Sequence, residues 1–204
     1  MNAPSNRVDD VMTWYDTIAP SYDELYGAEQ LRKYDHIFAV IQAPRILPHQ
    51  ENLVVIDVGC GTSLIVEELK KALAMRKYYY VGIDISLNIL KIAKRRIEEL
   101  DIIADLVAGD ASNLPFREDI ADIVFSISVF RCEDPVDNLI RESLRLCRPL
   151  GVVALTIVCG EGVDEIKCQE YPNSLYEGVI KSGRELIRVI KCEQLKDSDL
   201  REKP

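Results

Sequence analysis

A short glycine loop between a buried strand and a helix is the feature that most restricts the fold of this chain. Residues 53–58 are almost continuously apolar, as in a strand that is buried on both faces of a sheet. Gly59 and Gly61 follow at once, and an amphipathic pattern begins at Ile65. Glycine lets the backbone approach a ligand closely, and the start of a helix directs free N–H groups toward that ligand. The loop therefore predicts a nucleotide-binding α/β domain.

The pattern beyond the loop alternates between strands and helices as far as residue 158. We expect the later strands at 78–83, 104–108, 120–129 and 152–158, with helices between them. Residues 175–180 and 185–192 are expected to pair as an antiparallel hairpin across Ser182 and Gly183. This alternation predicts a Rossmann-like three-layer α/β/α sandwich. Its seven-stranded sheet should be mostly parallel, with the hairpin at its C-terminal end.

Three segments are expected along the chain. Residues 1–50 should form a small N-terminal helical cap with a frayed stretch over 1–10, an interruption at Ala19–Pro20 and an amphipathic helix over 31–41. Residues 51–195 should form the nucleotide-binding domain, and residues 196–204 a polar tail.

Composition and charge limit the classes of ligand. The chain has 204 residues and a net charge of −9, so we do not expect it to bind nucleic acid without a partner. No apolar run reaches the ~18 residues of a membrane span, and we expect a cytoplasmic protein with no membrane partner. The six cysteines form no Cys-x-x-Cys pair, and there are only two histidines. We therefore expect reduced cysteines and no metal site.

Two nucleotide cofactors compete for the glycine loop. A dinucleotide fingerprint requires a third glycine at position 64, where a helix packs tightly on a strand, but this chain has Leu64. In the pattern Asp-x-Gly-x-Gly-x-Gly, Asp57, Gly59 and Gly61 fit and only Ser63 departs. That pattern resembles the first motif of the class I S-adenosylmethionine (SAM) dependent methyltransferases. We expect Ser63 to be tolerated there and to help cap the following helix.

The resemblance to this family covers residues 53–158. Four further stretches follow in the family's order: YVGIDIS (80–86), AGDASNLPF (108–116), ADIVFSISVF (121–130) and RLCRPLG (145–151). The resemblance implies SAM as the cofactor, with its ribose on Asp84, its adenine on Asp110 and Ala111, and its methyl group near the end of the fourth strand. The cofactor-binding residues that it implies in this region are Asp57, Gly59, Cys60, Gly61, Asp84, Ile85, Asp110, Ala111 and Ser126.

The N-terminal stretch WYDTIAPSYDELY (14–26) adds to the resemblance. It is similar to a segment of the ubiquinone and menaquinone biosynthesis methyltransferases that folds over the cofactor, which implies that Tyr15 and Tyr22 bind the cofactor. Tyr22, Glu133 and Asp134 are the candidate catalytic residues on the acceptor side. Asp134 before a proline also fits a helix N-cap, which is the interpretation we favour. Ser86 is better placed than Asp84 to cap the helix that follows the second strand.

Two other features of the sequence favour structural interpretations. Cys60 is not expected to act as a nucleophile, because methyl transfer to N, O or S acceptors needs none. The basic side chains at 91, 94, 95 and 96 are expected to form a solvated helix face.

The sequence leaves the methyl acceptor open. We expect transfer of a methyl group from SAM, with a slight preference for a small-molecule acceptor. One alternative is an RNA or protein methyltransferase of the translation machinery that acts with a small activator subunit. Another is a non-catalytic SAM-binding subunit. Assembly as a homodimer is also left open, and Leu64 disfavours a dinucleotide-dependent oxidoreductase.

Overall fold

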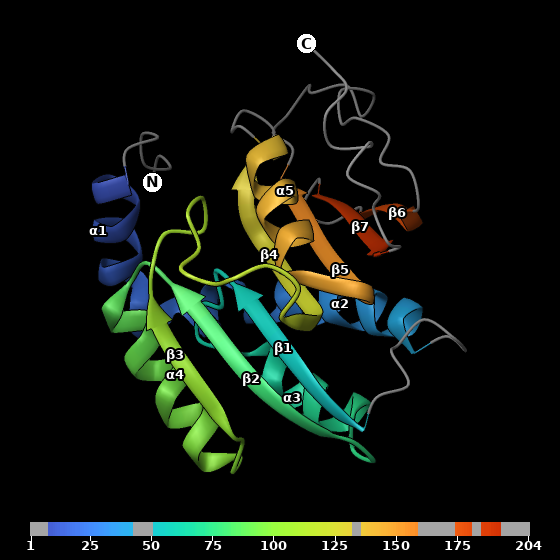
Figure 1. Cartoon of the computed structure of the whole chain (residues 1–204). Helices are drawn as coiled ribbons and strands as arrows, with labels where there is room; N and C mark the ends of the chain where they lie inside the picture. The colour runs from blue at the N-terminus through green and yellow to red at the C-terminus, as the bar shows by residue number, and fades with distance from the viewer. Residues whose placement is uncertain (1–7, 43–50, 132–135, 159–173, 181–184, 193–204) are drawn as a thin grey trace.

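The computed structural model describes residues 8–42, 51–131, 136–158, 174–180 and 185–192 (Figure 1). Seven strands form one sheet in the order β3-β2-β1-β4-β5-β7-β6. Their bounds are β1 (Asn52–Val58), β2 (Lys77–Asp84), β3 (Ala104–Ala108), β4 (Ala121–Arg131), β5 (Cys147–Val158), β6 (Ser174–Ile180) and β7 (Glu185–Lys191).

The strand directions confirm the predicted fold class. β1 pairs in parallel with β2 and β4, and the parallel pairing continues outward to β3 and β5. β7 pairs antiparallel with both β5 and β6. The expected hairpin is therefore present as a strand pair, and its turn at Ser182 and Gly183 lies outside the described residues.

Helices cover both faces of this sheet. They are α1 (Val8–Ile18), α2 (Tyr22–Ile41), α3 (Ile65–Ala72), α4 (Leu87–Glu99) and α5 (Val136–Leu146). Apolar side chains of α2, α3 and α4 share one core cluster with the sheet, and α5 contributes to the cluster on the other face. Figure 1 shows α2 running behind the sheet and α5 in front of it. Within the described ranges, no helix has the length and apolar character needed to cross a membrane.

The N-terminal helices confirm one prediction made from the sequence and contradict another. The predicted interruption is confirmed, because Ala19–Ser21 forms a short 3-10 turn between α1 and α2. The frayed beginning was predicted to extend through residue 10, which is wrong, because α1 begins at Val8. Asp9 and Asp10 lie in its first turn, where negative charge stabilises the positive end of a helix.

β5 begins earlier than the sequence predicts. Cys147 pairs with Ala121, and the register then shifts before Val152 pairs with Ile123. The irregularity is at Leu150, which has a left-handed φ of 68° and donates its N–H to the Cys192 carbonyl at 2.5 Å. Within the RLCRPLG stretch, Arg145 and Leu146 therefore end α5, and residues 147–151 form an irregular extension of the strand.

The strand order places a ligand crevice at one edge of the sheet. From β1 the chain moves outward to β2 and β3, and it then returns to β4 on the other side of β1. Open α/β sheets bind ligands where the order reverses in this way, outside the carboxyl ends of the strands. The loops after β1 and β4 are therefore the ones to consider first.

Candidate cofactor site at the ends of β1, β2 and β4

The glycine loop requires glycine at two positions. Gly59 and Gly61 have left-handed φ angles of 68° and 54°. A Cβ at Gly59 would lie 2.4 Å from Val129 Cγ2, and one at Gly61 would lie 3.3 Å from the Tyr22 hydroxyl oxygen. Between them, Cys60 donates its N–H to the Ile83 carbonyl at 2.8 Å, which extends the β1–β2 ladder into the loop. Bare backbone is thereby held at the predicted crevice.

Asp84 is anchored beside this loop at the end of β2. Its Oδ2 accepts the Gly61 N–H and its Oδ1 accepts the Ser86 N–H, both at 2.9 Å. Burial raises the pKa of the carboxyl, while these backbone donors oppose the rise. Each carboxylate oxygen has a second lone pair, so Asp84 can still accept ribose hydroxyls. Ser86, and not Asp84, caps α4 by accepting the Ile89 N–H at 3.1 Å, as the sequence predicts.

Asp57 lies beneath the loop in a polar cluster. The Tyr80 hydroxyl donates to Asp57 Oδ2 at 2.6 Å, and its oxygen lies 3.1 Å from Ser63 Oγ. Burial raises the pKa of Asp57 to about 7, while the hydrogen bond from Tyr80 lowers it and the charge of Asp84 adds to the rise. A large share of this carboxyl is therefore protonated near neutral pH.

Ser63 does not cap the helix that follows it, so that expectation is wrong. The N-cap residue of α3 is Leu64, which makes no side-chain capping bond. Ser63 is fully buried with a left-handed φ of 54°, and its hydroxyl faces Tyr80. This backbone conformation favours glycine and explains why the motif that the loop resembles has one there. The Leu64 side chain packs toward α2, where a Cβ at Gly27 would lie 3.7 Å from it.

Two aspartates fasten the N-terminal segment to the site. Asp16 Oδ1 accepts the Ser86 hydroxyl at 2.5 Å and the Asn88 N–H at 3.2 Å. Asp23 Oδ1 accepts the Thr62 hydroxyl at 2.5 Å. Figure 1 shows α1 beyond the arrowhead ends of β1 and β2, where the bonds of Asp16 hold it, while Asp23 fastens the start of α2. Neither role was predicted from the sequence, although the repeated Tyr-Asp pair at 15–16 and 22–23 is a signal that could have indicated them.

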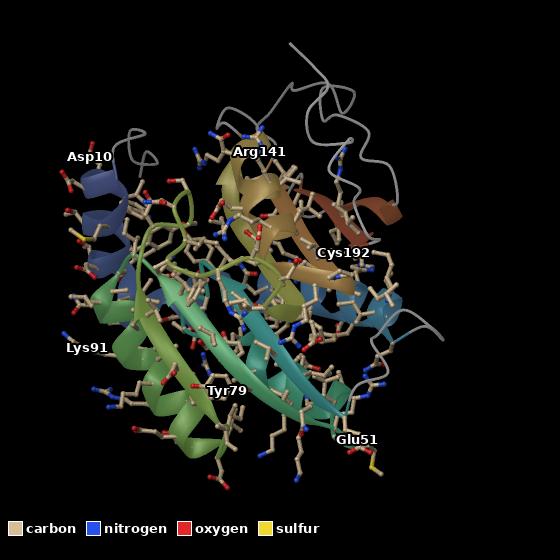
Figure 2. All side chains as sticks on the ribbon, viewed as in Figure 1. Asp10, Glu51, Tyr79, Lys91, Arg141 and Cys192 are labelled. Carbon is tan, nitrogen blue, oxygen red and sulfur yellow. The ribbon has the colours of Figure 1, made fainter. Side chains whose placement is uncertain are left out.

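The predicted solvated face of α4 is wrong for one of its four basic residues. Lys91, Lys94 and Arg95 are exposed, and Figure 2 shows Lys91 projecting away from the sheet. Arg96 instead donates to the Thr62 carbonyl at 2.6 Å and pairs with Asp23 at 2.5 Å and with Glu67 at 3.3 Å. Arginine can do this because its long apolar stem packs along the helix while the planar guanidinium binds several acceptors.

Three tyrosines of the N-terminal segment pack side by side over the loop. The ring centroids of Tyr15 and Tyr22 are 6.2 Å apart, and those of Tyr22 and Tyr26 are 5.2 Å apart. Burial raises the pKa of Tyr15 and Tyr22, and the charge of Asp84 adds to the rise in both. The Tyr22 hydroxyl therefore stays protonated at neutral pH, which makes it a hydrogen-bond donor rather than a general base.

The residues predicted to contact the adenine, Asp110 and Ala111, follow β3, and Ile85, another predicted cofactor-binding residue, follows β2. Asp110, Ala111 and Ile85 are all half-buried. Asp110 Oδ1 accepts the Ser112 N–H at 2.9 Å, so this carboxylate also caps its own turn. Arg145 holds the rest of that loop by donating to the Phe116 carbonyl at 2.8 Å. The adenine contact itself stays a prediction.

Two of the remaining predicted residues are buried, Ser126 in β4 and Cys60 in the glycine loop. Ser126 is fully buried in β4, and no described residue hydrogen-bonds its hydroxyl. Cys60 is buried and free, and burial raises the pKa of its thiol well above the usual value, which disfavours a thiolate nucleophile. Glu133 and Asp134 lie outside the described residues.

Comparisons with known proteins agree with the motifs. The family described as "Methyltransferase domain" matches residues 56–155. Demethylmenaquinone methyltransferase of Renibacterium salmoninarum is 32% identical over 148 residues, which cover 71% of this chain and 57% of that protein. The tRNA (carboxymethyluridine(34)-5-O)-methyltransferase of Arabidopsis thaliana is 30% identical over 154 residues, which cover 74% of this chain and 33% of that protein. The matched part thus spans about half, or less, of these curated relatives.

A solved structure supports the fold. The [4+2]-cyclase SpnF superposes with a TM-score of 0.70 at 15% sequence identity, covering 95% of this chain and 99% of that one. An identity this low shows the fold alone, and the cyclase name illustrates that this fold does not by itself specify methyl transfer. The family match and the curated relatives supply what the fold does not. With SAM as the methyl donor that the match implies, residues 56–155 form a methyltransferase domain of the class I SAM-dependent type.

Proposed function

We propose that this protein transfers a methyl group from SAM to a small-molecule acceptor. The observation that carries the proposal is the anchored carboxylate of Asp84, which is held by Gly61 and Ser86 beside bare loop backbone. A carboxylate fixed in this way can accept hydrogen bonds from the two ribose hydroxyls, and the glycines leave room for the rest of the cofactor. SAM supplies a methyl group that its sulfonium already activates.

The described residues of the site are suited to positioning and enclosing the ligands, and they supply no ionised nucleophile or tyrosinate base. Tyr22 lies against the glycine loop and Tyr15 packs beside it, and Asp16 and Asp23 fasten this N-terminal segment to the domain. Burial keeps the Tyr22 hydroxyl and the Cys60 thiol protonated. The chain's task is then to hold an acceptor atom in line with the methyl group at about 3 Å. A site of this kind suits an acceptor that is already nucleophilic.

The choice of a small-molecule acceptor is supported by relatives and charge. A second demethylmenaquinone methyltransferase, from Paenarthrobacter aurescens, is 33% identical over 149 residues. The net charge of −9 disfavours RNA, because nucleic acid repels an acidic surface. The second candidate is a tRNA acceptor, which the Arabidopsis relative at 30% identity favours. That function would need a partner, such as an activator subunit, to supply the basic surface.

Titration calorimetry tests the cofactor part of the proposal. We expect SAM to bind and NADH not to bind. Asp84→Ala should weaken SAM binding by about 10-fold or more, since hydrogen bonds to a charged group are worth about 1.5–3 kcal/mol. Asp105→Ala, on the exposed side of β3, is the matched control and should bind SAM as the wild type does. An unchanged affinity in Asp84→Ala would contradict the ribose assignment.

A labelling experiment tests the acceptor. Cell extract is incubated with the protein and SAM carrying a tritiated methyl group, and it is then separated into small molecules, RNA and protein. Label in the small-molecule fraction supports the proposal, and label in RNA supports the tRNA candidate. Label in no fraction, from a protein that binds SAM, would point to the non-catalytic subunit.

A further inference from the structure

A buried ion pair joins α2 to the ends of β4 and β7. Lys33 is 1% exposed, and its Nζ lies 2.8 Å from Glu185 Oε1 and 2.9 Å from Glu29 Oε1. The same ammonium donates to Ser128 Oγ at 2.7 Å. Ser128 is held in a left-handed conformation with φ at 60°, within an irregular part of β4. This cluster therefore fixes the hydroxyl of Ser128, and Thr156 Oγ1 accepts the Ser128 N–H at 2.7 Å.

The hydroxyl of Ser128 in turn fixes the side-chain amide of Gln30. Ser128 Oγ donates to Glu185 Oε1 at 3.1 Å, which uses its single proton. It can only accept from its other neighbours, which are Lys33 Nζ and Gln30 Nε2, the latter at 3.2 Å. The amide nitrogen of Gln30 must therefore face Ser128, and the amide oxygen must face the opposite way.

The amide oxygen of Gln30 is an acceptor without a donor. Gln30 is 6% exposed, and its Oε1 is buried with no hydrogen-bond partner among the described residues. Gln30 lines a small pocket beside the glycine loop together with Asp57, Gly59 and Ile127. A buried carbonyl oxygen without a donor is costly, so a side chain fixed in this way indicates a ligand that supplies the donor.

The chemistry of the pocket identifies that donor. Asp57 is a second buried acceptor in the same pocket, and the causes of its raised pKa include no neighbouring cation. A ligand group that both donates hydrogen bonds and carries positive charge would satisfy Gln30 and Asp57 together. SAM has two cationic groups, the sulfonium and the α-ammonium of its methionyl part, and only the ammonium has N–H donors.

We propose that Gln30 is a specificity residue whose amide oxygen accepts a hydrogen bond from the α-ammonium of SAM. Ser128, supported by Lys33 and Glu185, is the positioning residue that turns the amide toward the pocket. The inference rests on the proposed binding of SAM at the glycine loop. It adds a contact from α2 that none of the sequence motifs includes.

Titration calorimetry with two probes tests the contact. SAM carries the ammonium, whereas 5′-methylthioadenosine keeps the ribose and adenine but lacks the amino-acid part. Gln30→Leu should weaken SAM binding by about 10-fold and leave the affinity for 5′-methylthioadenosine unchanged. Gln42→Leu makes the same change at an exposed position beyond the end of α2 and should alter neither affinity.

The other outcomes are distinguishable. An equal loss for both probes would assign Gln30 a structural role and overturn the inference, as would an unchanged affinity for SAM. Failure of the wild-type chain to bind either probe would overturn the proposed function as well. Ser128→Ala is the second variant, and it should weaken SAM binding by a smaller factor, about threefold, again without affecting 5′-methylthioadenosine.

Discussion

The two polar clusters on either side of the glycine loop differ in how far apart their members lie along the chain. On the β2 side, Asp84 binds Gly61 and Ser86, which are 23 and 2 residues away. On the β4 side, Lys33 binds Ser128 and Glu185, which are 95 and 152 residues away. The first cluster is built from a motif and its neighbouring strand, and the second requires the whole fold. We therefore expect damage to the first to appear in cofactor binding. Damage to the second should appear mainly in stability, and at Ser128 also in SAM binding through Gln30.

The largest expected effect is on the β4 side. Lys33→Met would leave Glu185 buried without its cation, and breaking a buried pair from one side costs about 3–5 kcal/mol of the free energy of unfolding. Urea denaturation followed by circular dichroism measures the loss. Lys94→Met is the control. It removes an exposed ion pair with Glu98 on the surface of α4 and should change the free energy of unfolding little. Similar results for both variants would show that the buried cluster does not stabilise the fold.

The pH dependence of stability should reveal Asp57. Its pKa is about 7 in the folded chain against 3.8 as the ordinary value, so the folded state keeps its proton over an interval in which the unfolded state loses it. The resulting stabilisation is complete below pH 3.8 and is lost as the pH rises to about 7, by at most about 4 kcal/mol. Asp57→Asn should lack this decrease when both proteins are unfolded in urea across that range. Parallel curves for the two proteins would contradict the raised pKa.

Gly59 links the two regions, because it lies against Val129 of β4. Gly59→Ala places a methyl group 2.4 Å from Val129 Cγ2 on a backbone with φ at 68°. Overpacking and the left-handed conformation together should cost about 3 kcal/mol of the free energy of unfolding. Gly27→Ala is the matched change, with ordinary contact at 3.7 Å inside a helix, and should stabilise by about 0.5–1 kcal/mol. Thermal and urea unfolding should show opposite signs for the pair.

A smaller effect is expected at Arg96. Arg96→Met removes the bonds to Asp23 and to the Thr62 carbonyl, and so loosens the N-terminal segment over the glycine loop. We expect a loss of about 1–2 kcal/mol, because the group is 17% exposed and its partners are partly solvated. Lys91→Met on the same helix should change little. Limited proteolysis of the segment should accelerate only in the Arg96 variant, and equal rates would contradict its role as a fastening residue.

These contrasts explain what the sequence could predict. The glycine loop, the cap at Ser86 and the strands other than the early start of β5 follow from local periodicity and spacing, so their positions were predicted within a few residues. Arg96 was misjudged because the helical pattern places it beside exposed lysines, and only its tertiary partners distinguish it. Lys33 and Glu185 carry no local signal at all, because a charged residue on a helix and another at a strand end become a pair only when the sheet is complete.

The smallest effect, at Ser63, separates backbone strain from hydrogen bonding within the loop. Ser63→Gly relieves a left-handed conformation but loses the contact with Tyr80, and these contributions are each about 1 kcal/mol and opposite in sign. Ser63→Ala loses the contact and keeps the strain. We therefore expect Ser63→Gly to be nearly as stable as the wild type and Ser63→Ala to be about 1 kcal/mol less stable. If Ser63→Gly were the less stable of the two, relief of the left-handed conformation would not be the main difference between them. The serine would then be retained for packing beneath the loop.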